Sequence, residues 1–211
     1  MVRKDIKEFL NSIPKNVTLV AATKYVGIDD MLVLFENGIN NFGENRTDSF
    51  LAKYSVLQSK GVIWHFIGHL QRNKASEVIN KIDYLHSLDS LKLADLIEQK
   101  REKPLKCFVE VSINLEENKN GIPYYETKEF VKELLKFKKI ELVGLMMMAV
   151  KESNENSLEQ QFKKLRVLKQ EIEIELNIKL PYLSMGMSDD YKEAIKEGAT
   201  HIRLGRILYN L

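Results

Sequence analysis

The sequence predicts a (β/α)8 TIM barrel, a closed ring of parallel strands with helices between them, as a single domain over residues 1–211. Short apolar runs rich in β-branched and aromatic residues alternate with longer segments of helical spacing. The length of 211 residues also suits one compact barrel with one core. A doubly wound open sheet is the main alternative.

The short runs are almost continuously apolar, which is typical of parallel strands covered on both faces. Each run ends at glycine, asparagine, aspartate or serine, or just before one. The eight predicted strands comprise residues 17–22, 40–42, 62–67, 84–87, 105–112, 141–147, 182–185 and 201–204.

The predicted helices lie between these strands. The first of them begins with acidic residues suited to a helix N-terminus and stops before Gly38, and Gly198 is placed to end the last. The helices comprise residues 28–37, 47–58, 71–79, 90–101, 127–137, 158–176 and 189–197, with an extra N-terminal helix at 4–12. Two loops, 115–125 and 151–157, should lie at the C-terminal face of the barrel, where barrel active sites lie.

Composition excludes several classes of protein. Lys plus Arg is 32 and Asp plus Glu is 30, so the chain lacks the basic excess of a dedicated nucleic-acid binder. The single cysteine, Cys107, excludes an internal disulfide and a multi-cysteine zinc site, and its apolar strand predicts an inert buried thiol. No signal core or membrane-spanning run is present. We therefore expect a cytoplasmic protein with no membrane or nucleic-acid partner, and a monomer because a closed barrel has no open edge.

Lys24 directly follows the first strand, in VTLVAATKY. We expect it to point toward the barrel mouth from a partly apolar setting, which would lower its pKa. An uncharged lysine amine can form a Schiff base with an aldehyde. The alternative is an ordinary surface lysine beyond a strand end.

Two segments predict an anion site after the seventh and eighth strands. LSMGMSDDYKEAIKEG, residues 183–198, places serines and a glycine before a helix, whose free N–H groups attract anions. In THIRLGRILYN, residues 200–210, Gly205 allows close backbone approach, so the N–H groups of Gly205 and Arg206 can face a phosphate at the start of a terminal helix. Barrels often hold phosphate between these two loops. For the first segment, a simple loop capped by Ser188 is the alternative.

Three further features need an interpretation. Arg203 lies in the eighth strand, where an internal guanidinium requires an acceptor, either a ligand or a carboxylate such as Glu110. WHFIGHLQRNK, residues 64–74, contains His65 and His69 in a strand and turn, so their spacing favours loop positioning over metal binding. The methionines at 146–148 are interpreted as core packing.

These motifs together resemble the pyridoxal phosphate homeostasis protein family, also described as proline synthetase co-transcribed homologues. The resemblance covers most of the chain, and its most specific parts are the histidine-containing motif and LSMGMSDD. The matching segments are VAATKY (20–25), NFGENR (41–46), WHFIGHLQRNK (64–74), EENKNGI (116–122), GLMMM (144–148), LSMGMSDDYKEAI (183–195) and HIRLGR (201–206).

The resemblance implies a barrel like the N-terminal domain of alanine racemase, with pyridoxal 5′-phosphate bound. Lys24 matches the family's aldimine-forming lysine, and Arg203 matches the arginine that contacts the pyridine ring. Ser184 and the backbone at Gly205 and Arg206 match the phosphate contacts. Ser188 and Asn45 complete the set of cofactor-binding residues that the resemblance implies. No residue is assigned a catalytic role or a metal.

The resemblance also implies a role in vitamin B6 homeostasis without robust turnover, with cofactor-recipient enzymes as candidate partners. Two positions depart from the family pattern, since Val150 replaces an expected proline and Arg206 replaces a small hydroxyl residue, which removes one side-chain contact to phosphate. An amino-acid racemase is one alternative, but only five residues follow Arg206, which leaves no room for the second domain that racemases of this fold carry. A barrel enzyme that captures a phosphorylated sugar aldehyde on Lys24 is another.

Overall fold

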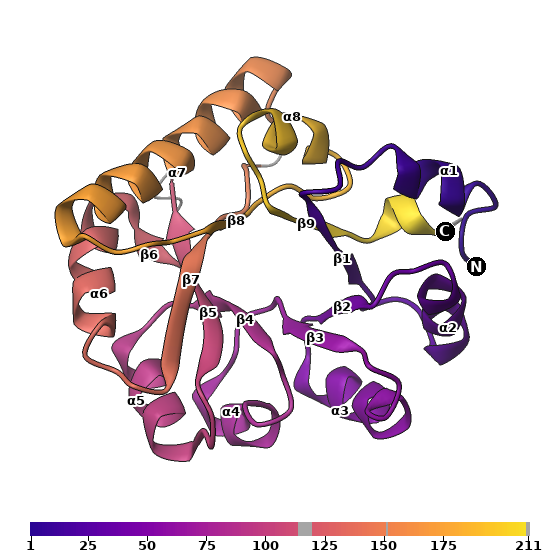
Figure 1. Ribbon diagram of the computed structural model, residues 1–211, viewed down its shortest axis with the longest axis horizontal. Coiled ribbons are helices and arrows are strands. Elements are labelled where there is room, and N and C mark those ends of the chain that lie inside the picture. The colour runs from indigo at the N-terminus through magenta and orange to yellow at the C-terminus, as the bar shows by residue number, and fades with distance from the viewer. Residues whose placement is uncertain (114–119, 151, 210–211) are drawn as a thin grey trace.

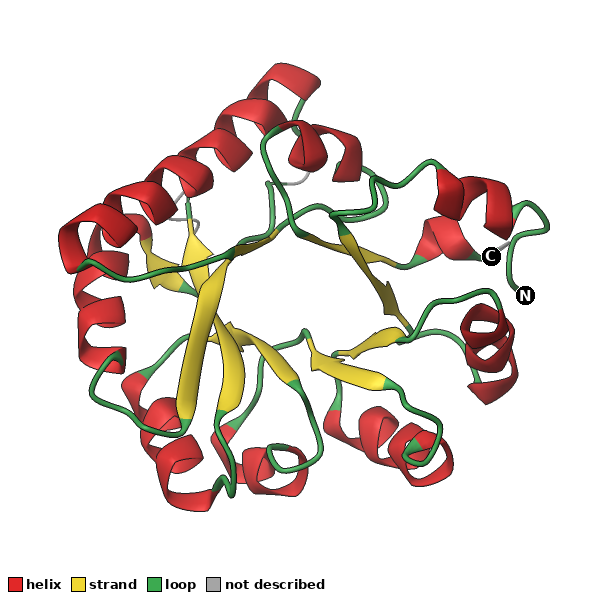
Figure 2. Cartoon of the chain, viewed as in Figure 1, coloured by secondary structure: helices red, strands yellow, loops and turns green. Residues whose placement is uncertain are grey.

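The computed structural model is a closed parallel barrel surrounded by helices (Figure 1, Figure 2). It describes residues 1–113, 120–150 and 152–209. The strand order is β4-β3-β2-β1-β9-β8-β7-β5-β6, and β4 also pairs with β5, which closes a ring of eight strands and leaves β6 outside it. The predicted fold class is confirmed, and the open-sheet alternative is wrong.

All eight predicted strands are present, with ends displaced by at most two residues. The strands are β1 (Thr18–Ala22), β2 (Asn41–Glu44), β3 (Ile63–Phe66), β4 (Tyr84–Leu88), β5 (Leu105–Ser112), β6 (Ile122–Pro123), β7 (Ile140–Met146), β8 (Tyr182–Ser184) and β9 (His201–Leu204). The helices are α1 (Ile6–Asn11), α2 (Ile28–Glu36), α3 (Thr47–Leu57), α4 (Arg72–Val78), α5 (Leu91–Lys100), α6 (Thr127–Leu134), α7 (Glu155–Leu176) and α8 (Tyr191–Lys196), with 3-10 turns η1 (Tyr124–Glu126) and η2 (Arg206–Leu208).

Three local predictions are wrong. The predicted loop 151–157 is helical from Glu155, because the Asn154 side chain accepts a hydrogen bond from the Ser157 N–H at 2.9 Å and so begins α7. The loop 115–125 contains β6 and the start of η1, while residues 114–119 lie outside the described part of the chain. After β9 the chain forms the single turn η2 where a terminal helix was expected.

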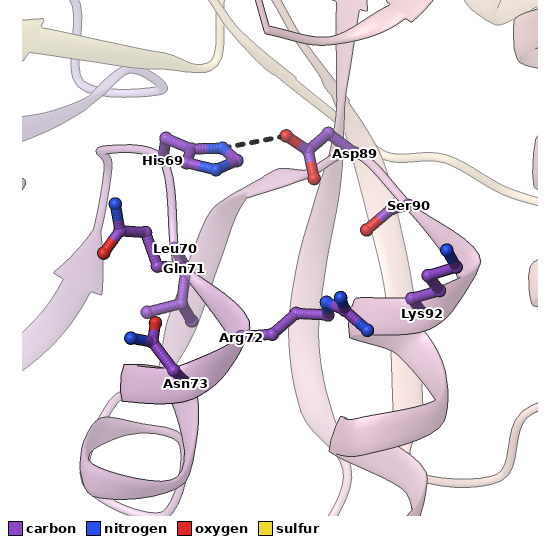
Figure 3. A pocket seen from close by; sticks show the side chains of 8 residues that line it. All are labelled: His69, Leu70, Gln71, Arg72, Asn73, Asp89, Ser90 and Lys92. Atoms are coloured by element: carbon purple, nitrogen blue, oxygen red, sulfur yellow. Dashed lines mark hydrogen bonds and ion pairs between the residues drawn. The ribbon is translucent and has the colours of Figure 1, made fainter.

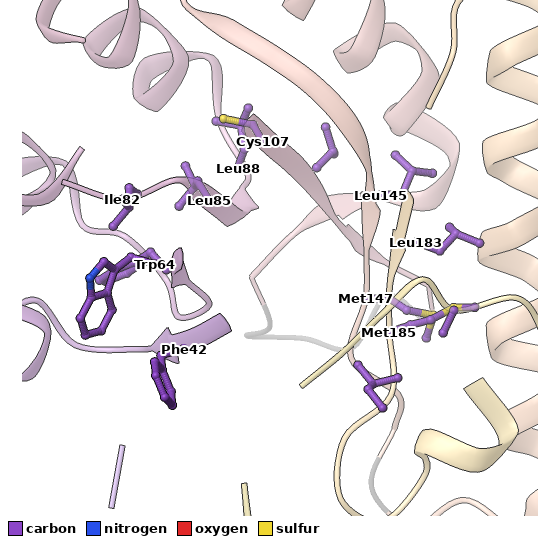
Figure 4. Packing of buried hydrophobic residues seen from close by; sticks show 14 of the residues in the cluster. Phe42, Trp64, Ile82, Leu85, Leu88, Cys107, Leu145, Met147, Leu183 and Met185 are labelled. Atoms are coloured by element: carbon purple, nitrogen blue, oxygen red, sulfur yellow. The ribbon is translucent and has the colours of Figure 1, made fainter. Parts of the chain in front are cut away.

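The main core lies between the outer surface of the barrel and the helices (Figure 4). Cys107 and Met147 are fully buried in it, and burial raises the pKa of the Cys107 thiol, which confirms a structural cysteine. Met146 is also buried, but Met148 is 48% exposed, so the core interpretation holds for two of the three methionines. In the described ranges, no helix is both long and apolar enough to cross a bilayer.

Glycine at two positions permits close approach of the backbone at the two ends of β8. A Cβ on Gly144 would lie 2.0 Å from the Tyr182 carbonyl oxygen of the neighbouring strand. Gly186 has a φ of +92°, and a Cβ there would lie 2.7 Å from the Ala194 Cβ of α8. The loop after β8 can therefore turn tightly, and its Gly186 carbonyl accepts the Arg203 N–H at 2.9 Å.

Candidate functional site

The predicted site residues come from four consecutive strands of the ring. Lys24 follows β1, Asn45 follows β2, Ser188 follows β8 and Gly205 follows β9, and the ring order β2-β1-β9-β8 makes these strands neighbours. Because the strands are parallel, their carboxyl ends lie on one face of the barrel. The fold therefore gathers loops distant in the sequence at one mouth.

Lys24 lies two residues beyond the end of β1. Its side chain is exposed, and its Nζ lies 4.6 Å from the ring centroid of Tyr25, a cation–π distance. The expected partly apolar setting is therefore wrong, because the chain has left the strand before it reaches this residue. The amine is open to an approaching aldehyde.

The backbone just before Lys24 is held by a buried polar cluster. The Thr23 hydroxyl donates to Glu44 Oε1 at 2.5 Å, and Lys53 Nζ donates to the Thr23 carbonyl at 2.6 Å. Lys53 and Glu44 also form an ion pair, with side chains 10% and 0% exposed. This cluster fixes the end of β1. Sequence reasoning missed it, because Lys53 looks like any other polar residue of an amphipathic helix.

Ser188 and Gly205 belong to a small hydrogen-bonded cluster between the last two loops. Ser188 Oγ accepts the Gly205 N–H at 3.2 Å and the Ile207 N–H at 3.4 Å. The capping alternative for Ser188 is wrong, because α8 begins after Asp190. Arg206 is exposed, and its guanidinium bonds to Asp189. Backbone N–H groups that already face an oxygen are suited to hold a phosphate oxygen.

Arg203 lies inside the barrel, 4% exposed. Its NH1 donates to Ser184 Oγ at 2.6 Å and its NH2 to the Met147 carbonyl at 2.9 Å. Burial lowers the pKa of the guanidinium to about 10, so it remains charged at neutral pH. No ion pair joins Arg203 to Glu110 or another carboxylate in the described residues, so the salt-bridge alternative is wrong.

Ser184 is fully buried, and its hydroxyl contacts Arg203 and His86. This position is below the mouth, within the barrel. A direct contact between Ser184 and phosphate stays a prediction. The geometry favours Ser188 for that contact, because its hydroxyl lies beside the backbone N–H groups of Gly205 and Ile207.

Asn45 has an unpartnered acceptor at the edge of the site. Its Oδ1 is buried and has no hydrogen-bond partner among the described residues. Gly68 makes room for this turn, since a Cβ on Gly68 would lie 2.4 Å from the Asn45 carbonyl oxygen. A buried acceptor without a donor is costly unless a ligand supplies one.

Glu110 is a second buried ionisable group in the barrel, 4% exposed. Burial raises the pKa of its carboxyl to about 7, with Asp89 adding to the effect and Arg203 and His69 opposing it. The unfolded chain ionises the same carboxyl near 4.5. Folding therefore becomes less favourable as the pH rises from 4.5 through 7, because the native state resists losing this proton.

Glu110→Gln removes this pH dependence. We expect the variant to exceed the wild-type free energy of unfolding by up to about 3 kcal/mol at pH 8 and by almost nothing at pH 4. Urea unfolding at both pH values measures the difference. Glu141→Gln, at an exposed position, serves as the control. Equal differences at pH 4 and pH 8 would contradict the assignment.

The interior also contains three histidines that sequence reasoning did not bring together. His65, His86 and His201 come from β3, β4 and β9 and are all buried. Burial holds the pKa of each below its usual range, so they are neutral at pH 7. Strand alternation could have found them, since His65 stands between the outward residues Trp64 and Phe66.

The rest of the histidine-containing motif lies outside the barrel. His69 bonds to Asp89 at 3.0 Å, on the rim, so His65 and His69 do not share a site. These rim residues line a pocket of about 470 Å³ at the beginnings of α4 and α5, with Arg72 and Lys92 on its walls (Figure 3). The pocket lining does not include Lys24.

Comparison with known sequences places this geometry in context. The model of the alanine racemase N-terminal domain matches residues 2–211. The chain is 37% identical to a pyridoxal phosphate homeostasis protein of Aquifex aeolicus, over 90% of this chain and 85% of that protein. It is 36% identical to the pyridoxal phosphate homeostasis protein of Synechocystis, over 96% of this chain and 94% of that protein.

Solved structures share the fold. PipY of Synechococcus elongatus, solved with PLP bound, superposes with a TM-score of 0.89 at 27% identity, covering 97% of this chain and 100% of that chain. An alanine racemase of Clostridium difficile superposes with a TM-score of 0.82 at 16% identity, covering 99% of this chain and 57% of that enzyme. The second likeness concerns the barrel fold alone.

Proposed function

Because the chain belongs to the family of the alanine racemase N-terminal domain and to the pyridoxal phosphate homeostasis proteins, we propose that it binds pyridoxal 5′-phosphate and serves in the homeostasis of that cofactor. The observation that carries the proposal is that Lys24 and the Ser188–Gly205 cluster follow neighbouring parallel strands, with Arg203 buried in the strand that precedes Gly205. Lys24 supplies an amine, Arg203 supplies a fixed cation, and the Ser188–Gly205 cluster supplies N–H groups that can bind an oxyanion.

The residues fit this cofactor in three respects. When bound, pyridoxal 5′-phosphate supplies an aldehyde open to a lysine amine, a phosphate and a hydroxylated pyridine ring. Lys24 is exposed for covalent attachment, and the N–H groups of Gly205 and Ile207 already face an oxygen acceptor. The buried Asn45 Oδ1 needs a donor, which a hydroxyl of the ring would supply. Arg206 contributes its backbone.

The position of Arg203 favours binding of the cofactor over catalysis of a reaction such as racemisation. A guanidinium only donates hydrogen bonds, so it leaves a neighbouring pyridine nitrogen unprotonated. An unprotonated ring withdraws electrons weakly, which suits a carrier better than a racemase. The relatives' names also describe homeostasis. We therefore propose a cytoplasmic, monomeric carrier without robust turnover, from which recipient enzymes obtain the cofactor.

The absorption spectrum of the purified protein tests the binding proposal. Added pyridoxal 5′-phosphate should be retained through gel filtration, with an absorption band distinct from that of the free aldehyde. A protein that stays colourless and retains none would favour a barrel enzyme for a phosphorylated metabolite. Chiral analysis of incubated alanine tests the absence of turnover, and sustained racemisation that Lys24→Ala abolishes would make the protein a racemase.

Ser188→Ala should weaken the hold on phosphate specifically. Loss of a hydroxyl beside the Gly205 N–H is expected to reduce affinity for pyridoxal 5′-phosphate about tenfold, about 1.4 kcal/mol, while affinity for pyridoxal stays unchanged. Equilibrium dialysis with both aldehydes measures the difference. Ser55→Ala, at an exposed position of α3, is the matched control. An equal loss for both aldehydes would remove Ser188 from the phosphate site.

A further inference from the structure

A continuous chain of hydrogen bonds runs through the barrel below the site. Arg203 NH1 contacts Ser184 Oγ at 2.6 Å, and Ser184 Oγ contacts His86 Nδ1 at 2.8 Å. His86 Nε2 contacts His65 Nδ1 at 2.9 Å, and His65 Nε2 contacts Asn41 Oδ1 at 2.9 Å. This chain of hydrogen bonds begins at Arg203, near the end of β9, and ends at Asn41, where β2 begins. Its interior members, Ser184, His86 and His65, are at most 1% exposed.

The two ends of this chain fix the direction of every bond in it. Arg203 can only donate, and a carboxamide oxygen such as Asn41 Oδ1 can only accept. Asn41 is oriented by a further bond, since its Nδ2 donates to Asn40 Oδ1 at 2.9 Å. His65 must then carry its proton on Nε2 and accept through Nδ1.

The same reasoning applies to the next links. His86 must donate through Nε2 and accept through Nδ1, so the Ser184 hydroxyl must give its proton to His86. The Ser184 lone pairs are left for Arg203. Two neutral histidines satisfy every link, and an additional proton on either would bring two donors face to face. Their low pKa values agree with this arrangement.

We propose that His86 and His65 are positioning residues of the cofactor site, which fix the Ser184 hydroxyl and through it the orientation of the Arg203 guanidinium. The aligned dipoles of the chain direct an oxygen toward this buried cation, which has the Met147 carbonyl as its other contact. The role at the cofactor rests on the proposed function, whereas the arrangement of protons in the chain does not.

The first test is made without the cofactor. Nitrogen-15 NMR of the imidazole rings distinguishes a proton on Nδ1 from one on Nε2. We expect His65 and His86 to be neutral between about pH 6 and about pH 8, each protonated on Nε2 alone. A proton on Nδ1 of either ring, or titration of either ring in that interval, would overturn the proposed chain.

The second test measures binding of pyridoxal 5′-phosphate and the absorption maximum of the bound form. His86→Leu removes the hydrogen bonds of His86 to Ser184 and His65, so it should weaken binding about tenfold and shift the absorption maximum. His86→Gln keeps one acceptor and one donor, so it should restore most of the affinity and most of the wild-type absorption. Ser184→Ala should match His86→Leu, and the double variant should be no worse than either. Phe108→Leu controls for core damage. The ring centroids of Phe108 and His86 are 4.5 Å apart, but Phe108 is not part of the hydrogen-bond chain.

The outcomes separate the two proposals. A folded His86→Leu variant with wild-type affinity and absorption would overturn the positioning role, as would His86→Gln behaving like His86→Leu, or additive losses in the double variant. Phe108→Leu reproducing the spectral shift would overturn it as well. Wild-type protein that fails to bind pyridoxal 5′-phosphate would refute the proposed function, and the NMR result would then decide on the chain by itself.

Discussion

Lys24→Ala is expected to abolish covalent capture of pyridoxal 5′-phosphate completely. The exposed amine at the mouth of the barrel is the nucleophile that we assign to the aldehyde, and alanine has no replacement for it. The spectrum of the protein-bound cofactor should revert to that of the free aldehyde. Because Lys24 is exposed, its loss should change the free energy of unfolding by no more than about 0.5 kcal/mol.

Two controls make this result specific. Lys7→Ala removes another exposed lysine, on α1, and should leave the spectrum unchanged. Urea unfolding of both variants should match the wild type, which separates loss of the amine from loss of the fold. A Lys24→Ala protein that keeps the wild-type absorption band would show that another amine captures the cofactor.

Lys53→Met should destabilise the protein strongly, by about 3–5 kcal/mol, because it leaves the Glu44 carboxylate buried without its cation. Glu44 Oε2 already has no hydrogen-bond partner among the described residues, so no other group there can replace the ammonium. The Thr23 carbonyl also loses a donor at 2.6 Å. Chemical denaturation measures the loss.

The double variant Lys53→Met/Glu44→Gln separates charge from packing. Neutralising both partners should recover part of the stability lost by Lys53→Met alone, since no unpaired charge remains in the core. Lys60→Met, at an exposed position, should leave the free energy of unfolding nearly unchanged. If the double variant is less stable than Lys53→Met by the full cost of Glu44→Gln, the two side chains act independently and the buried pair does not hold the end of β1.

The barrel could be predicted from the sequence because each of its strands is a local pattern. A run such as LKCFVEVS, residues 105–112, is apolar on both faces, and the observed β5 has the same bounds. The two loops to which we assign the phosphate could also be located from the sequence, since Gly205 and Ser188 lie beside strand ends. Helix starts were less visible, because Asn154 begins α7 inside a stretch that looks like a polar loop.

Strand alternation indicates that His65 points inward, but the partners of the polar interior could not be predicted, because they depend on register between strands. His65 pairs with Tyr84 across β3 and β4, and Ser184 pairs with His201 across β8 and β9. These pairings, together with the ring contacts of His86 with His65 and His201, bring the three histidines together although β3 and β9 lie far apart in the sequence. The Lys53–Glu44 pair depends likewise on how α3 rotates against the barrel.

The shared barrel does not by itself decide between carrier and racemase. This chain covers 57% of the alanine racemase of Clostridium difficile, which extends beyond the matched region. The pyridoxal phosphate homeostasis proteins match it nearly end to end, at 85% and 94% of their lengths. The position of Arg203, a charged donor inside the barrel, agrees with the carrier role that we propose, because a guanidinium beside the cofactor ring would favour its neutral form.

Borohydride reduction followed by peptide mass mapping tests most directly that the cofactor is held on Lys24. The wild-type protein is incubated with pyridoxal 5′-phosphate, reduced and digested. We predict that the peptide containing Lys24 carries the reduced cofactor and that modification approaches one group per chain. An unmodified Lys24 peptide, with the cofactor on other lysines or on none, would contradict the account.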